Sequence, residues 1–274
     1  MSGTDFSTLA DHYAERAVVQ RSAGERLLDL LAIQPHEDVL DLGCGVGDLT
    51  RRIRELTRGT VVGMDASPGM IRQARERHAD ADIRFLLKKG EGLDDRDCYD
   101  VIYCNSVFQW FTEPRRVVAN CYRALRLGGR MGVQAPAKRV YSPTFLAAVE
   151  RVRSDPRTGA TFAHFKEPWF LLETAEAYAA LFEQAGFRVR LARIETVHSR
   201  HTPSDVFRVF DSGATAGYLN QACYDVPIDA DYIEAFRAIV RRAFAEQAGR
   251  DGRMDLVFHR IYLLAVKERG GAYG

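Results

Sequence analysis

Hydrophobic and polar residues follow a helical period at the start of the chain and then a pattern of short apolar runs. Residues 7–32 carry apolar side chains at helical spacing, with Gly24 as the one weak point, and predict one or two amphipathic helices. Pro35 ends this segment. The apolar run at residues 38–42 stops before a glycine, as a buried parallel strand does, and residues 49–56 predict a helix. The chain therefore opens with helices, followed by a strand and another helix.

The alternation of strand and helix continues through the first half of the chain. Ser67-Pro68 predicts a helix start, because serine caps a helix N-terminus and proline suits the first turn. Gly128-Gly129 is expected to end a later helix. The further predicted strands are residues 60–64, 83–87, 99–104 and 130–134, and the predicted helices are residues 70–78 and 114–127. Strands that alternate with helices indicate a parallel sheet.

The rhythm loosens over residues 141–170 and then returns. We expect a helix at residues 174–184 with its stop at Gly186, a strand at 187–197 and helices within 203–250. The apolar run at 256–266 is placed as a closing antiparallel strand. The whole pattern predicts an α/β fold with a Rossmann-like, seven-stranded, mostly parallel sheet, an antiparallel last strand and a helical cap.

Composition narrows the class of protein. With 46% hydrophobic and 27% charged residues, the 274-residue chain can bury a substantial core. Its formal net charge of +1 offers no broad field for a polyanion, so nucleic acid is not expected as a partner. The 5 cysteines form no C-x-x-C pair, which indicates a reducing compartment without disulfides. No apolar stretch suits a signal peptide or a membrane helix, so we expect no membrane association and a cytoplasmic location.

Three glycines follow the first predicted strand. Gly43, Gly45 and Gly47 stand at alternate positions, where missing side chains let a ligand approach the backbone beside a helix N-terminus. The G-x-G-x-G spacing differs from the G-x-G-x-x-G of dinucleotide-binding proteins, and Asp41 lies two residues before the first glycine. Because that carboxylate would repel a pyrophosphate and attract an α-ammonium group, the turn favours a ligand with an amino acid moiety.

A second carboxylate ends the next predicted strand. The run Gly63-Met64-Asp65 places Asp65 at the strand tip, where this architecture binds ribose hydroxyls. We expect Asp65 to accept hydrogen bonds from both ribose hydroxyls of a nucleoside.

Four motifs in this region carry a resemblance. V-L-D-L-G-C-G-V-G, V-V-G-M-D-A-S-P-G-M-I, Y-D-V-I-Y-C-N and L-R-L-G-G-R follow one another across residues 39–131, and with them the chain resembles the class I S-adenosylmethionine-dependent methyltransferases. The resemblance implies S-adenosylmethionine as the cofactor. It implies that the three glycines line the methionine moiety, that Ala66 and Met70 border the adenine, and that Asn105 lies beside the sulfonium. The implied cofactor-binding set is Asp41, Gly43, Cys44, Gly45, Gly47, Asp65, Ala66, Met70, Gly90, Glu91 and Asn105.

One motif departs from the family pattern. Members commonly carry an aspartate near position 89 that meets the adenine amino group, whereas this chain has Lys88-Lys89-Gly90-Glu91. Either Glu91 or backbone groups then serve the adenine. Cys44 is interpreted as a small filler of the glycine turn.

Shorter matches point to a subfamily. Residues 6–31, Gln109-Trp110, Gly213-Ala214-Thr215 and Phe258-His259 resemble the carboxyl methyltransferases that act on malonyl thioesters in biotin synthesis. Trans-aconitate and juvenile-hormone-acid methyltransferases share the same plan. The resemblance implies a 1–34 helical cap, a 35–136 cofactor-binding core, and a 137–274 remainder with cap segments near 140–175 and 200–253. We expect these parts to form one structural unit.

The methyl acceptor is expected to be a small molecule, free or as an acyl thioester. A carboxylate nucleophile needs alignment and a dry site but no catalytic base, and the chain shows no evident catalytic dyad. Tyr13 and Trp110 are candidate pocket residues that compete with plain packing. Substrate binding is predicted for Tyr13, Gln109, Trp110, Arg139 and Arg208, the arginines as carboxylate partners or as solvated surface residues. We expect no metal site, because the histidines show no ligand spacing.

Three other functions compete with O-methylation of a carboxylate. C- or N-methylation in a natural-product pathway needs a base, for which Tyr13, His12 or Glu91 are candidates. A non-methylating protein of the same fold keeps the cofactor site without the transfer. A NAD-dependent oxidoreductase is disfavoured by the glycine spacing and by Asp41.

Overall fold

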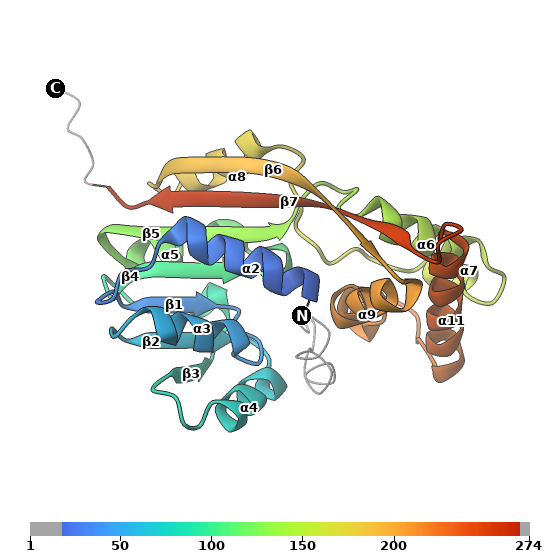
Figure 1. Ribbon diagram of the computed structural model, residues 1–274, viewed down its shortest axis with the longest axis horizontal. Coiled ribbons are helices and arrows are strands. Elements are labelled where there is room, and N and C mark those ends of the chain that lie inside the picture. Colours follow the sequence, from blue (N-terminus) through green and yellow to red (C-terminus); the bar gives the residue numbers. More distant parts are fainter. Residues whose placement is uncertain (1–17, 269–274) are drawn as a thin grey trace. The chain divides into compact units, whose positions relative to one another are not determined.

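The computed structural model describes residues 18–268, whose backbone forms two compact units (Figure 1). The first, which we call the sheet unit, holds residues 18–139, 170–195 and 260–268. The second, which we call the aromatic unit, holds residues 140–169 and 196–259. The expected division at residues 34 and 136 within one structural unit stays a prediction.

Seven strands form a single sheet within the described residues, in the order β3-β2-β1-β4-β5-β7-β6. Neighbouring strands from β3 through to β5 run parallel, and β7 runs antiparallel to β5. The strands are β1 (Val39–Leu42), β2 (Val61–Asp65), β3 (Arg84–Leu87), β4 (Tyr99–Asn105), β5 (Leu125–Pro136), β6 (Arg188–His201) and β7 (Met254–Val266). The predicted Rossmann-like sheet with an antiparallel last strand is confirmed.

The two longest strands of the sheet, β6 and β7, lie side by side. Arg190 pairs with Glu268, and the Ser199 hydroxyl donates to the Leu256 carbonyl, so residue numbers rise along one strand as they fall along the other. The strands are therefore antiparallel. The boundary between the sheet unit and the aromatic unit falls inside both strands.

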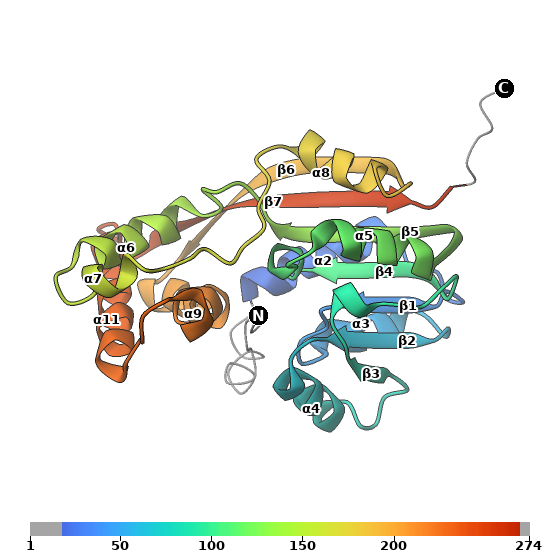
Figure 2. The same ribbon diagram turned by 180° about the vertical axis from the view of Figure 1, so that it is seen from behind.

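Helices cover both faces of the sheet within the sheet unit. α2 and α3 lie on one face, and α5 and α8 lie on the other (Figures 1 and 2). The helical segments of this unit are α2 (Val18–Leu31), α3 (Asp48–Leu56), α4 (Pro68–Arg77), α5 (Pro114–Ala124) and α8 (Ala175–Glu183), with short 3₁₀ turns η1 (Gly90–Gly92) and η2 (Phe108–Trp110). As predicted, Ser67 caps α4 by accepting from the Met70 amide at 3.3 Å, and Pro68 is the first helical residue.

The predicted helix over residues 114–127 is confirmed as far as Ala124, but its predicted stop at Gly128-Gly129 is wrong. The helix ends at Ala124, and the glycine pair lies inside β5. Tyr99 pairs with Leu125 but Val101 pairs with Arg130, so the ladder bulges at the glycines, where Gly128 has a φ of +86°. Lys267 closes the bulge, since its carbonyl accepts from Gly128 and its amide donates to Gly129. The glycines serve a bulge rather than a helix stop.

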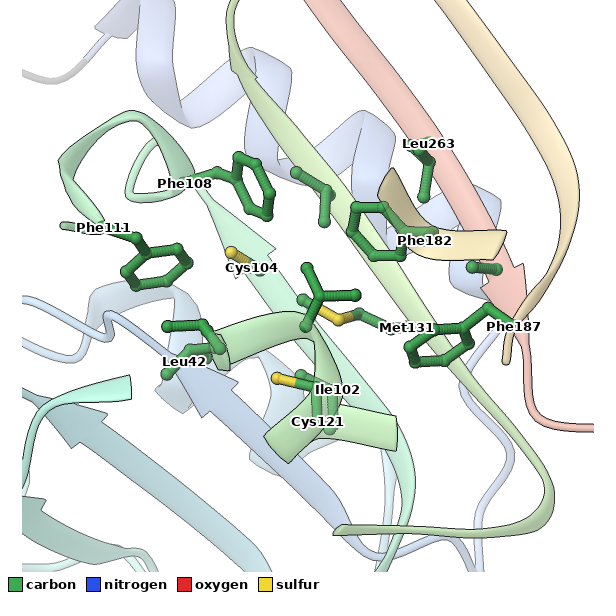
Figure 3. Close-up of a cluster of buried hydrophobic side chains, with 14 of the residues drawn as sticks. Leu42, Ile102, Cys104, Phe108, Phe111, Cys121, Met131, Phe182, Phe187 and Leu263 are labelled. Atoms are coloured by element: carbon green, nitrogen blue, oxygen red, sulfur yellow. The ribbon is translucent and has the colours of Figure 1, made fainter. Parts of the chain in front are cut away.

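The larger hydrophobic core of the sheet unit lies between the sheet and α5 and α8. Side chains from strands β1, β2, β4, β5 and β7 meet side chains from α5, α8 and η2 there, and many are inaccessible to solvent (Figure 3). They include Leu42, Ile102, Cys104, Phe108, Phe111, Cys121, Met131, Phe182, Phe187 and Leu263. A second cluster on the opposite face packs Leu27, Leu28 and Leu31 of α2 against strand residues. Apolar burial on both faces explains why the parallel strands appear in the sequence as continuous apolar runs.

The aromatic unit contains the segment in which the sequence rhythm loosens. Its elements are α6 (Pro143–Ser154), α7 (Gly159–Phe162), α9 (Pro203–Gly213), α10 (Thr215–Tyr218), η3 (Gln221–Cys223) and α11 (Ala230–Glu246). Edge-to-face aromatic pairs join them: Phe145 meets Phe210 at 5.0 Å, and Trp169 meets Tyr218 at 4.9 Å between ring centroids. Each such pair stabilises the fold by about 0.5–1.5 kcal/mol beyond its buried area.

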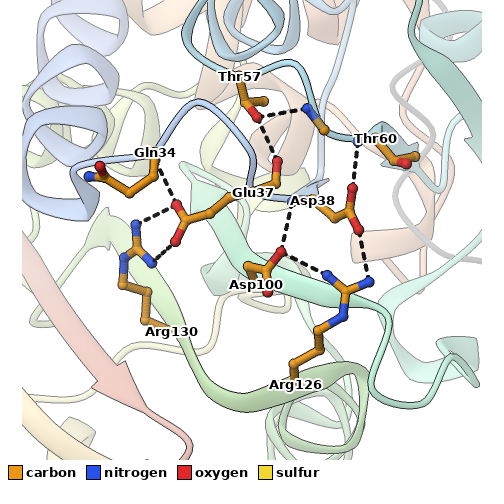
Figure 4. A network of polar contacts seen from close by, with 9 residues as sticks. Gln34, Glu37, Asp38, Thr57, Thr60, Asp100, Arg126 and Arg130 are labelled. Atoms are coloured by element: carbon orange, nitrogen blue, oxygen red, sulfur yellow. Dashed lines mark hydrogen bonds and ion pairs between the residues drawn. The ribbon is translucent and has the colours of Figure 1, made fainter.

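A polar network ties together the amino ends of the central strands (Figure 4). The Arg130 guanidinium donates two hydrogen bonds to the Glu37 carboxylate, at 2.7 and 2.8 Å. The Arg126 guanidinium bridges Asp38 and Asp100 at 2.8 and 2.7 Å. The network thus lies where β1 and β4 begin, at the ends opposite the glycine turn.

Two further observations bear on the sequence predictions. All five cysteines carry free thiols. Among residues 18–268, no helix combines the length and the apolar character needed to cross a membrane.

Candidate cofactor and acceptor site

The glycine turn after β1 has the backbone geometry that its sequence requires. Gly43, Gly45 and Gly47 have φ angles of +82°, +55° and +86°, in the left-handed region that favours glycine. A Cβ atom at Gly43 would lie 2.5 Å from a methyl group of Val107. The turn therefore needs glycine at position 43 both for its conformation and for its packing.

The turn is also tied to the neighbouring strand. The amides of Gly43 and Cys44 both donate to the Met64 carbonyl, at 2.7 and 3.0 Å. Gly47 forms the N-cap of α3, so the helix begins directly after the turn, with its first amides lacking helical partners. The loop, the tip of β2 and the helix start thus form one rigid corner.

Asp65 at the tip of β2 holds the middle of the turn. One carboxylate oxygen accepts from the Gly45 amide at 2.9 Å, and the other accepts from the Ser67 amide at 2.8 Å. Burial raises the pKa of Asp65 above its ordinary value, and the amide hydrogen bonds from Ser67, Gly45 and Ala66 oppose this effect. The structure brings Asp65 and the glycine turn together, as the motifs predicted.

Asp41 lies beneath the turn rather than on its surface. Its side chain is 2% exposed, and its Oδ2 accepts from the Thr50 hydroxyl at 2.6 Å. Burial raises the pKa of Asp41 to about 7, and the negative charge of Asp65 adds to this, whereas the Thr50 hydrogen bond opposes it. Asp41 is therefore a carboxyl group that changes its charge near neutral pH.

The chemistry of these groups fits the implied cofactor. The buried carboxyl group of Asp41 and the half-buried one of Asp65 suit an ammonium group and ribose hydroxyls, which are hydrogen-bond donors, and they disfavour a pyrophosphate. The backbone of the turn carries no side chain at three positions, which lets a ligand approach the main chain closely.

The residues predicted to border the adenine follow β2. Ala66 is exposed, and Met70 on the first turn of α4 is buried with 3% exposure. Cys44 packs against Ile71 and Phe85, and burial, followed by the charges of Asp41 and Asp65, raises the pKa of its thiol. This supports the interpretation of Cys44 as a filler of the turn.

Glu91 has partners of its own. Gly90 is buried, and the Glu91 carboxylate accepts from the Thr112 amide at 3.0 Å and from the Thr112 hydroxyl at 3.1 Å. The Glu113 amide also donates to it, at 3.4 Å. Since these donors precede α5, the carboxylate anchors the start of that helix. Of the two alternatives for the adenine contact, this geometry favours backbone groups.

Asn105 at the end of β4 belongs to a buried polar chain. With its amide oriented to satisfy its neighbours, Gln134 of β5 donates to Asn105 Oδ1 at 2.7 Å and to Ser106 Oγ at 3.1 Å. It also accepts from Nη1 of Arg260 in β7 at 3.0 Å. Ser106 has a φ of +57°, a strained conformation for a residue with a side chain, and its amide donates to the Gln134 carbonyl.

Gln109 and Trp110 lie on η2, directly after this segment. The Gln109 side chain is 7% exposed, and its amide nitrogen donates to the Ser106 carbonyl at 2.9 Å. Its Oε1 is buried without a hydrogen-bond partner. Trp110 is half-buried. Both residues thus lie close to Asn105 in the fold. Their role in substrate binding stays a prediction.

The two predicted substrate arginines are on the surface of their own units. Arg139 is exposed, and its amide donates to Glu173 at 2.9 Å. Arg208 on α9 is exposed and paired with Asp205. Tyr13 and His12 lie outside the described residues.

The sequence analysis missed Thr50, Val107, Gln134 and Arg260. Val107, Gln134 and Arg260 each contact a residue that is remote in sequence, so no local pattern marks them. Thr50 could have been found, since it lies on the first turn of the helix that follows the glycines. Among residues 18–268, no three or more histidine, cysteine, aspartate or glutamate side chains cluster as metal ligands would.

Comparisons with known proteins agree with this geometry. Residues 39–129 match the family model described as a methyltransferase domain. Over 125 residues the chain is 40% identical to a malonyl-[acyl-carrier protein] O-methyltransferase of Pectobacterium atrosepticum, covering 45% of this chain and 48% of that protein. Over 245 residues it is 27% identical to a trans-aconitate 2-methyltransferase of Methylobacterium nodulans, covering 88% of this chain and 92% of that protein.

Solved structures share the fold. The YcgJ protein from Bacillus subtilis matches with a TM-score of 0.60 and 16% identity over 91% of this chain and 100% of that one. The matches to the malonyl-[acyl-carrier protein] relatives span 45% to 64% of those proteins' lengths.

The fold is that of Rossmann-like methyltransferases, and the chemistry of the glycine turn is compatible with a nucleoside-linked amino acid as cofactor. Residues 39–129 carry a methyltransferase domain of the class I S-adenosylmethionine-dependent type, with S-adenosylmethionine as its cofactor. The predictions of family, enzyme class and cofactor are confirmed.

Proposed function

We propose that the protein transfers the methyl group of S-adenosylmethionine to a carboxylate oxygen of a small organic acid or acyl thioester. The observation that carries the cofactor half of this proposal is the double hydrogen bond of Asp65 to the Gly45 and Ser67 amides, at 2.9 and 2.8 Å. It fixes a carboxylate at a strand tip beside a glycine turn and a helix N-terminus, where a nucleoside with an amino acid tail is expected to bind.

The acceptor half rests on the relatives. Proteins named for methylation of malonyl-[acyl-carrier protein] and of trans-aconitate both methylate acids, and the trans-aconitate relative matches along 88% of this chain. A carboxylic acid is thus the acceptor class that both groups of relatives support. The five free thiols suit a reducing compartment, and we place the reaction in the cytoplasm.

Each part of the site has a proposed role. The backbone of the glycine turn would line the methionine moiety, Asp41 would attract its ammonium group, and Asp65 would hold the ribose. Met70 would border the adenine, and Asn105 would lie beside the methyl group. Trp110 and Gln109 would face the acceptor.

The proposed reaction requires little proton transfer by the protein. When bound, S-adenosylmethionine supplies a methyl group already activated by its sulfonium. A carboxylate acceptor is ionised at neutral pH, so the residues around Asn105 have only to align it and to exclude water. This agrees with a site in which Asp41 and Asp65 are engaged by Thr50, Gly45 and Ser67 rather than by a catalytic histidine.

Calorimetry of cofactor binding tests the proposal. Asp65→Ala should abolish measurable binding of S-adenosylmethionine, because it removes the acceptor for the ribose hydroxyls and releases the Gly45 amide. Asp82→Ala is the matched control, since that side chain is fully exposed and distant from the turn. Unchanged affinity in Asp65→Ala would refute the site assignment, and a wild-type protein that binds the cofactor but methylates no carboxylic acid would refute the acceptor class.

A further inference from the structure

Arg260 on β7 is a buried cation at the ends of the strands that carry the site. Arg260 is 3% exposed, and it pairs in the sheet with Pro136 at the end of β5. Burial lowers the pKa of its guanidinium to about 10, an effect that Tyr262 opposes, so the side chain remains charged at neutral pH. Burying a charge is costly in proteins, so a buried guanidinium is retained where polar groups hold it, as Gln134 does here.

The guanidinium is linked to the candidate reaction centre by one side chain. Gln134, which is 0% exposed, accepts from Arg260 Nη1 at 3.0 Å and donates to Asn105 Oδ1 at 2.7 Å. The same amide nitrogen donates to Ser106 Oγ at 3.1 Å. The orientation of Arg260 is therefore fixed, and the side-chain amide of Gln134 links it to Asn105 at the end of β4.

The position matches the chemistry of a carboxylic acid. A planar guanidinium binds a carboxylate with defined geometry, and the interaction strengthens in a site from which water is excluded. The two arginines that sequence pattern singled out, Arg139 and Arg208, are exposed, so solvent screens their charge. Arg260 is the arginine whose burial and connection to Asn105 suit acceptor recognition.

We propose that Arg260 binds the carboxylate of the methyl acceptor and, oriented by Gln134, sets the specificity of the enzyme for acids. This inference rests on the proposed function for the position of the methyl group beside Asn105. It assigns Arg260 a substrate-binding role, with Gln134 as a positioning residue.

Binding of acids, measured separately from methyl transfer, tests the assignment. Trans-aconitate and the malonyl thioester of pantetheine are titrated into the protein saturated with S-adenosylhomocysteine. Arg260→Gln should weaken binding of whichever acid the wild type binds by about 30-fold or more, because a neutral amide replaces a buried cation. Affinity for S-adenosylhomocysteine should stay within about twofold, since the glycine turn is not altered.

Matched variants separate recognition from folding. Arg260→Lys keeps the charge but loses the planar fork, and should weaken acid binding by about tenfold. If thermal melting shows that Arg260→Gln does not fold, Arg260→Lys serves as the test variant in its place. Arg188→Gln, on the neighbouring strand β6 and 66% exposed at its side chain, should bind acids as the wild type does.

The outcomes are distinct. Acid binding that is unchanged in a folded Arg260 variant overturns the inference, as does its loss in Arg139→Gln or Arg208→Gln instead. A wild-type protein that binds neither acid overturns it too. If the wild type binds an acid through Arg260 but does not methylate it, the inference stands and the proposed function fails.

Discussion

The Thr50 hydroxyl donates a 2.6 Å hydrogen bond to the Asp41 carboxyl group, and both side chains are buried beneath the glycine turn. Because burial raises the pKa of Asp41 to about 7 although the Thr50 hydrogen bond opposes this, cofactor binding should be sensitive to pH in the physiological range. If the cofactor's ammonium group binds ionised Asp41, its dissociation constant should rise about tenfold for each pH unit below 7 and level off above. Calorimetry between pH 5.5 and 8.5 measures this.

Substitutions at both residues check that prediction. Asp41→Asn should flatten the pH dependence. Thr50→Val should move the break to higher pH, because the hydrogen bond that opposes the raised pKa is lost, and Thr50→Ser should leave it in place. The stability of the fold should change with pH in the opposite direction. Because the pKa of Asp41 in the folded protein exceeds its ordinary value of 3.8, Asp41 favours the folded state in acid, and this contribution is lost as pH rises toward 7. An affinity independent of pH would contradict the role of Asp41.

Two glycines with similar backbone angles should differ sharply on substitution by alanine. Gly43 and Gly128 have φ angles of +82° and +86°. A Cβ at Gly43 would strike Val107 at 2.5 Å, whereas one at Gly128 would meet nothing within 4 Å. We expect Gly128→Ala to cost about 1 kcal/mol from backbone strain, and Gly43→Ala to cost roughly 2–5 kcal/mol and to abolish cofactor binding. Urea denaturation and calorimetry compare them.

The double variant Gly43→Ala/Val107→Ala separates the two causes of that cost. If the collision with Val107 dominates, the second substitution should restore part of the lost stability. Equal costs for the two single glycine variants would show that packing against Val107 is unimportant.

Glu91 should matter for stability more than for the cofactor. Its carboxylate accepts from the Thr112 amide and hydroxyl before α5 begins, so Glu91→Ala should lower the free energy of unfolding by about 1–2 kcal/mol, as loss of a helix cap does. Cofactor affinity should stay within about twofold. Glu113→Ala, at a side chain 57% exposed, is the control. A large loss of affinity in Glu91→Ala would instead assign this carboxylate to the adenine amino group.

The network at the amino ends of the strands should stabilise the fold without touching the site. Burial raises the pKa of Glu37, but hydrogen bonds from Arg130 and from the Gln34 amide outweigh it and hold that pKa below its ordinary value. Arg130→Met should cost roughly 1–3 kcal/mol at pH 7. Since a depressed pKa stabilises above the ordinary value of 4.5 and is lost as pH falls, the difference from wild type should shrink in acid.

The surface pair Arg52 and Glu55, about half exposed on each side, provides the control for that experiment. Arg52→Met should change stability by about 0.5 kcal/mol or less. Urea denaturation at pH 7 and pH 4 measures the stability of both variants and its change with pH. Calorimetry at pH 7 measures their affinity for the cofactor. Reduced cofactor affinity in Arg130→Met would show that the network reaches the glycine turn.

The sheet could be predicted from sequence because its parallel strands are buried on both faces and stand out as short apolar runs between glycine or proline signals. In the aromatic unit, α9 and α11 confirm the helices expected within 203–250, whereas α6 and α7 lie in the segment where the sequence rhythm loosens and were not predicted. One signal was nevertheless present: Ser142 caps α6 and Pro143 follows it, the same pair that correctly predicted the start of α4. The glycine pair at 128 failed as a helix stop because glycines serve bulges equally well.

The candidate site divides in the same way. Asp41 and Asp65 were predictable, because each stands at a fixed offset from a strand end and a glycine. Arg260 and Gln134 were not, since the contact between them arises from the insertion of β7 beside β5, which brings the end of the chain to its middle. Local pattern thus indicated the proposed cofactor-binding groups, whereas the proposed acceptor-binding residue could be found only from tertiary structure.

Because the boundary between the two units falls inside β6 and β7, the chain passes from one unit to the other at residues 139/140, 169/170, 195/196 and 259/260. The aromatic unit is therefore not one continuous stretch of sequence, and exchanging residues 196–259 for those of a relative would cut both long strands. An engineer who wishes to redirect this part of the enzyme does better to change single residues within the intact strands.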